Sequence, residues 1–150
     1  MDGSQVSYYA CRGKQPAKLI VSRPRGNRAI VACFDLNGDK VDELISDKDI
    51  YDLKQKASVD LKYPTGTAPK NSIGIFPVEC GKFLKGEGTL AAIPVSPEKY
   101  SRTGVCLFRK DGSCAYYEEF GGRVSGIAMI KTKSQDYLIV QMNEKLLIYP

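Results

Sequence analysis

The feature of this sequence that most limits its fold is a succession of short apolar runs separated by turn residues. Residues 28–36, RAIVACFDL, alternate along the chain with a period of two, as a β-strand does. Asn37-Gly38, Asp111-Gly112 and Asn143-Glu144 each separate two such runs, and dipeptides of this kind are typical of hairpin turns. The pattern predicts about seven to nine strands, most of them joined in antiparallel fashion.

One segment has the spacing of a helix. Within residues 46–58, Ser46 is typical of a helix N-cap, and Asp49 places negative charge in the first turn. Apolar residues then recur at the spacing of one helix face, at Ile50, Leu53 and Ala57. The sequence therefore predicts an α+β fold: antiparallel β-sheet(s) with a single α-helix at about residues 46–58 packed on one face. A chain of this length is expected to form a single domain over residues 1–150.

The chain contains no histidine, and this excludes the function classes that need a catalytic His. Ser-His-Asp and Cys-His hydrolysis and His-dependent ribonuclease chemistry are among them, so we expect that the protein is not an enzyme. Its five cysteines show no Cys-x-x-Cys spacing, so no zinc site and no cofactor is expected. No apolar run approaches the roughly 18 residues of a membrane span, so we expect no membrane insertion.

Glu118 and Glu119 form an adjacent carboxylate pair beside Tyr116 and Tyr117. A glycosidase needs two carboxylates that face one cleft about 5 to 10 Å apart. Neighbours in a strand point to opposite faces, so the pattern does not favour a catalytic pair.

The charges are segregated along a chain whose net charge is +5. Residues 3–34 contain six basic residues and no acid, whereas residues 35–60 contain eight acids and four lysines. The basic segment, with its two tyrosines, is the candidate surface for binding nucleic acid or a protein partner, because basic groups contact phosphates and tyrosines stack on bases. Its residues are Tyr8, Tyr9, Arg12, Lys14, Lys18, Arg23, Arg25 and Arg28. The alternative is that the basic and acidic segments neutralise one another and that the tyrosines belong to a sheet.

The stretch FDLNGDKVDELIS, residues 34–46, has the alternating oxygen ligands of a calcium loop. It resembles the Asp-x-Asn-Gly-Asp-Gly-x-x-Asp loop of integrin-type propeller repeats, which implies the ligand set Asp35, Asn37, Asp39 and Glu43. Such repeats come in arrays, and this chain has one copy, with Lys40 where a glycine is usual. The hairpin interpretation explains the same residues without a metal. The main expectation is therefore that no metal binds, and calcium binding is the alternative.

A second resemblance covers roughly residues 30–120, together with one short motif near the N-terminus. Tyr9-Ala10-Cys11, the strand that ends in CFDLNG, the segment 46–58, Tyr63-Pro64 and the run GVCLF occur in the order seen in small secreted effectors of powdery mildew fungi. The chain thereby resembles these effectors and the guanyl-specific fungal ribonucleases whose fold they are thought to share. The ribonucleases have a catalytic His after Tyr-Pro, where this chain has Thr65, and their second His has no counterpart here. The resemblance implies a ribonuclease-like scaffold without ribonuclease chemistry.

These observations lead to two main hypotheses about function; a third, a His-independent carboxylate enzyme, requires Glu79, Glu118 or Glu119 to lie with another acid in one cleft. The first is a non-catalytic secreted effector that engages a host protein or RNA during virulence. The second is a β-rich structural or interaction module, with calcium stabilisation through residues 35–43 as its variant. Secretion is expected under the first hypothesis, and a cytoplasmic location otherwise.

Overall fold

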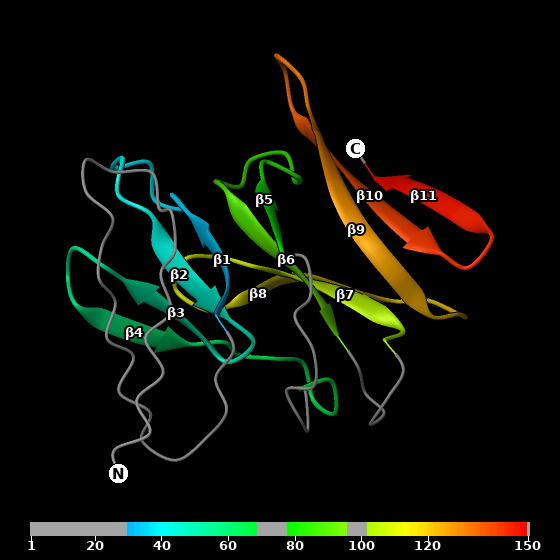
Figure 1. The fold of residues 1–150 in the computed structure, drawn as a ribbon, viewed down its shortest axis with the longest axis horizontal. Helices are drawn as coiled ribbons and strands as arrows, with labels where there is room; N and C mark the ends of the chain where they lie inside the picture. The colour runs from blue at the N-terminus through cyan, green and yellow to red at the C-terminus, as the bar shows by residue number, and fades with distance from the viewer. Residues whose placement is uncertain (1–29, 69–77, 96–101, 150) are drawn as a thin grey trace, which may run out of the picture.

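The computed structural model describes residues 30–68, 78–95 and 102–149, and these residues contain eleven β-strands and no helix. The strands form three antiparallel sheets that lie side by side in Figure 1. The first sheet contains β1 (Ile30–Phe34), β2 (Glu43–Ser46), β3 (Asp49–Asp52) and β4 (Ala57–Asp60). The second contains β5 (Glu79–Gly81), β6 (Leu90–Val95), β7 (Gly104–Phe108) and β8 (Cys114–Glu119). The third contains β9 (Val124–Lys131), β10 (Asp136–Met142) and β11 (Lys145–Tyr149), and within every sheet consecutive strands are neighbours.

The predicted helix at residues 46–58 is wrong, and so is the predicted α+β class: the described part of the chain is all-β. The segment contains the end of β2, the whole of β3 and the start of β4, and β3 pairs with β4 through Ile50↔Val59. Ile50 is buried whereas Ala57 is exposed, so the apolar residues at helical spacing do not share one buried face. In the residues that the structure describes, no helix is long and apolar enough to cross a membrane.

Local hydrogen bonds explain why this segment resembles a helix start. The Ser46 hydroxyl oxygen accepts hydrogen bonds from the backbone N–H groups of Lys48 and Asp49, at 3.0 and 2.9 Å. Asp52 Oδ1 accepts two more, both at 2.8 Å, from the N–H groups two and three residues further on. Ser and Asp make such bonds both at helix N-termini and in tight turns. Here they close the turn between β2 and β3 and the turn between β3 and β4.

Two of the three predicted hairpins are confirmed. The turn between β7 and β8 contains Gly112 with a φ of 76°, and Asn143-Glu144 joins β10 to β11. The predicted two-residue turn at Asn37-Gly38 is wrong in size, because β1 ends at Phe34 and the return strand begins only at Glu43.

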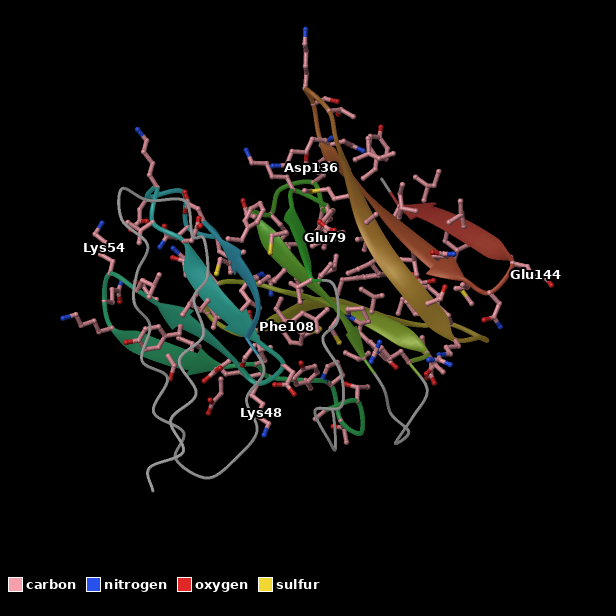
Figure 2. All side chains as sticks on the ribbon, viewed as in Figure 1. Lys48, Lys54, Glu79, Phe108, Asp136 and Glu144 are labelled. Atoms are coloured by element: carbon pink, nitrogen blue, oxygen red, sulfur yellow. The ribbon has the colours of Figure 1, made fainter. Side chains whose placement is uncertain are left out.

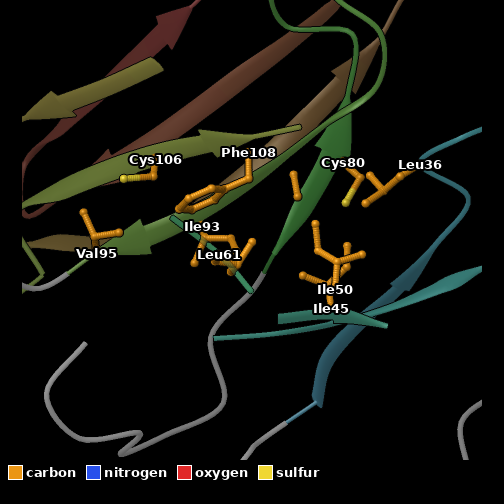
Figure 3. Packing of buried hydrophobic residues seen from close by; sticks show 10 residues of the cluster. Leu36, Ile45, Ile50, Leu61, Cys80, Ile93, Val95, Cys106 and Phe108 are labelled. Atoms are coloured by element: carbon orange, nitrogen blue, oxygen red, sulfur yellow. The ribbon is translucent and has the colours of Figure 1, made fainter. Parts of the chain in front are cut away.

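The second sheet is the middle layer, and its two faces support two hydrophobic clusters. Along β7, Cys106 and Phe108 belong to the cluster shared with the first sheet, whereas Val105 and Leu107 belong to the cluster shared with the third. Strands buried on both faces need apolar side chains at every position, which explains the uninterrupted run GVCLF. Figure 3 shows the cluster around Phe108, whose side chain is fully buried.

Hydrogen bonds and aromatic contacts also join the layers. The ring of Tyr63 meets that of Phe108 edge-on, with 4.9 Å between the centroids. The N–H of Lys62 donates to the carbonyl oxygen of Gly112 at 2.8 Å, next to a parallel bridge between Lys62 and Ser113. On the other side, the Lys82 N–H donates to Asp136 Oδ2 at 2.9 Å. Asp136, labelled in Figure 2, is the first residue of β10.

Candidate functional site

The predicted binding residues of the basic segment lie outside the described residues. These are Tyr8, Tyr9, Arg12, Lys14, Lys18, Arg23, Arg25 and Arg28. Contact with a partner or with RNA through them stays a prediction from the sequence.

The predicted metal-ligand residues are brought together, but their oxygens are engaged by protein groups. Asp35 Oδ1 accepts the N–H of Gly38 at 2.6 Å and that of Asp39 at 3.1 Å, and Asp35 Oδ2 accepts the N–H of Lys40 at 2.9 Å. Asp39 Oδ2 forms an ion pair with the ammonium of Lys54 at 3.0 Å. Among the described residues, no group of three or more His, Cys, Asp or Glu side chains is arranged to hold a metal.

Glu43 fixes this loop from inside. Its Oε2 accepts the N–H of Leu36 and its Oε1 accepts the side-chain amide of Asn37, both at 2.7 Å. Only 4% of Glu43 is exposed. Burial raises the pKa of its carboxyl above the ordinary value of 4.5, the bond from Leu36 opposes that shift, and the charges of Asp52, Asp35 and Asp39 add to it. A buried carboxylate with two donors is a structural anchor for the turn.

Replacing Glu43 with glutamine is expected to change how stability depends on pH. Since the pKa of Glu43 is higher in the folded state, the wild type loses stability as the pH rises from about 4.5 through the folded pKa, and stability from this group is fully present below 4.5. A glutamine side chain does not titrate, so the stability of E43Q should increase relative to that of the wild type as the pH rises over that range. Urea unfolding between pH 4 and 8 measures this, with E144Q on exposed Glu144 as the control. Parallel pH profiles for the wild type and E43Q would contradict a raised pKa of Glu43 in the folded state.

An apolar pocket of about 190 Å³ lies between the second and third sheets. The second sheet and its adjoining loops contribute Phe83, Leu84, Val105, Leu107, Tyr116, Glu118 and Phe120. The third sheet contributes Leu138, Val140 and Tyr149. We call this space the inter-sheet pocket. Most of its lining residues belong to the second hydrophobic cluster. Tyr116, in contrast, is 42% exposed to solvent.

The alternation of β8 places one acidic residue, Glu118, in the lining of this pocket. Tyr116 and Glu118 both line it, whereas Tyr117 packs against the cluster on the other face of the sheet. The Tyr116 hydroxyl donates to Glu118 Oε2 at 2.8 Å. Burial, followed by the charge of Glu118, raises the pKa of Tyr149 to about 12. The expectation that Glu118 and its neighbour Glu119 do not face one cleft agrees with this arrangement.

Sequence reasoning missed this pocket. Its lining comes from strands far apart in the chain, and only the spacing of Tyr116, Glu118 and Phe120 at alternate positions marks one strand face. That spacing can be recognised in the sequence, but the sequence does not show which residues of β10 and β11 complete the pocket.

Comparisons with family models, with curated proteins and with solved structures gave no match for this chain.

Proposed function

We propose that the protein is a non-enzymatic, β-rich interaction module that binds a side chain of a partner in the inter-sheet pocket. The observation that carries this proposal is an apolar pocket between the second and third sheets, next to the second hydrophobic cluster, whose lining includes one acidic residue. Pockets of this kind, apolar with a few placed polar groups, are the usual form of binding sites.

The size of the pocket favours a single side chain over a metabolite. A cavity of about 150 Å³ holds one benzene molecule, whereas drug-sized ligands need roughly 300 Å³ or more. The inter-sheet pocket, with about 190 Å³, therefore suits one anchoring side chain of a larger partner. Buried anchors of this type supply much of the binding energy at protein interfaces.

The chemistry of the described residues supports a role without catalysis. The sequence has no histidine, and a nucleophilic cysteine needs a lowered pKa. Burial instead raises the thiol pKa of Cys80, Cys106 and Cys114. Binding of a host protein or RNA through the basic segment, and secretion, remain proposals that rest on the sequence alone.

Titration with 2-phenylethanol, a neutral probe with one ring, tests the pocket. In ¹³C-methyl NMR spectra we expect the methyl signals of Val105, Leu107 and Val140 to shift with saturation, because these side chains line the pocket. The methyl signals of Ile45 and Val95, in the other cluster, serve as the control and should stay in place.

The variant L84W fills the pocket from a half-buried loop position and should abolish the shifts. Equal shifts in both clusters, or shifts that persist in L84W, would contradict binding at this pocket.

A further inference from the structure

Among the described residues that line the inter-sheet pocket, Glu118 is the one acidic residue, and none is a lysine or an arginine. The ion pairs between described residues join Lys54 to Asp39 and Arg109 to Glu87, so neither neutralises Glu118. The hydroxyl of Tyr116, which donates to Glu118, is neutral. Glu118 therefore belongs to the lining of an apolar pocket and has no counter-ion from the described part of the chain.

Aromatic residues share this pocket lining with Glu118. Tyr116, Phe120 and Tyr149 belong to the lining, and the rings of Phe120 and Tyr149 have centroids 6.2 Å apart. The faces of aromatic rings attract cations, and a carboxylate at the edge of an apolar space attracts them more strongly than it would in water. An anionic ligand would meet like charge at Glu118, and a neutral one would leave that charge unmatched.

We propose that the inter-sheet pocket selects a basic side chain, lysine or arginine, presented by a protein partner. The aliphatic stem of such a side chain would lie along the apolar lining beside half-buried Leu84, and its cationic head would reach Glu118 near Tyr116 and Tyr149. Lysine and arginine commonly bury their stems on apolar surfaces in this way and keep the charge at a polar group. This inference rests on the proposed function and adds the chemical class of the ligand.

Three probes with the same ring distinguish the charge classes: 2-phenylethylamine, 2-phenylethanol and 3-phenylpropanoate. In the full chain at low salt, we expect the amine to bind about tenfold more tightly than the alcohol, as a charge-assisted hydrogen bond provides, and the carboxylate to bind most weakly. In the variant E118Q the amine and the alcohol should bind equally.

The matched control is E119Q, which removes a neighbouring charge from an exposed position outside the pocket lining. It should keep the tenfold preference. Equal binding of amine and alcohol to the wild type, or loss of the preference in E119Q as large as in E118Q, would overturn the basic-ligand inference while leaving the pocket intact as a site. The absence of methyl shifts with all three probes would overturn the proposed function as well.

Discussion

Replacement of Phe108 by alanine is expected to lower the free energy of unfolding by about 3–5 kcal/mol, the usual cost of removing a large buried aromatic side chain. Phe108 is fully buried, lies between the first and second sheets in Figures 2 and 3, and meets the edge of the Tyr63 ring. Its loss leaves a cavity where the two layers meet. Urea unfolding followed by tyrosine fluorescence measures the change, because the chain has nine tyrosines and no tryptophan.

The control for this variant is L146A on β11, because Leu146 is 66% exposed. A substitution at such an exposed position should lower the free energy of unfolding by less than about 0.5 kcal/mol. If F108A were no more destabilising than L146A, the stacking of the first two sheets around Phe108 would be incorrect.

Replacement of Gly112 by alanine is expected to lower the free energy of unfolding by about 3–4 kcal/mol. The same replacement at Gly38 is expected to lower it by about 1–2 kcal/mol. Both glycines have positive φ, 76° at Gly112 and 79° at Gly38, so both variants bear the strain of a left-handed side-chain residue. A Cβ at Gly38 would meet open space, whereas one at Gly112 would overlap the carbonyl oxygen of Asp60. The variant at Gly112 therefore has to push the first sheet away from the β7–β8 hairpin and weaken the bond from Lys62 to Gly112.

Urea unfolding of G112A and G38A side by side measures the difference between two glycines with the same backbone strain. Equal losses would show that the end of β4 does not pack against the hairpin turn in solution.

The two confirmed hairpins are predicted from the sequence because their signals are local. Gly112 adopts the positive φ that an Asp-Gly turn requires, and Asn143-Glu144 joins two strands directly. The runs on β6 and β7 are apolar at every position because both of their faces are buried.

The predicted helix at residues 46–58 is wrong because its start signal, Ser46, is shared by helix N-termini and tight turns, and here the Ser46 hydroxyl closes a turn. Only the pairing of β3 with β2 and β4, which is a tertiary interaction, decides between the two. The loop at residues 35–43 also has two interpretations from the sequence. Alternating side-chain oxygens are typical both of a metal site and of a turn held by hydrogen bonds from side chains to the backbone. The buried hydrogen bonds of Glu43 favour the turn.

The inter-sheet pocket lay beyond sequence reasoning for the same reason. Tyr116 and Tyr149 come together only because the third sheet packs on one face of the second. No local pattern in either strand specifies that packing.

Selection from a random peptide display library is the sharpest test of whether a partner inserts a basic side chain into the inter-sheet pocket. Peptides enriched on the wild-type protein are then measured for binding to L84W and E118Q. We expect that enriched peptides share a lysine or arginine beside apolar residues and bind both variants at least about tenfold more weakly. Enriched peptides that lack a basic residue, or that bind both variants as tightly as the wild type, would contradict insertion of a basic side chain.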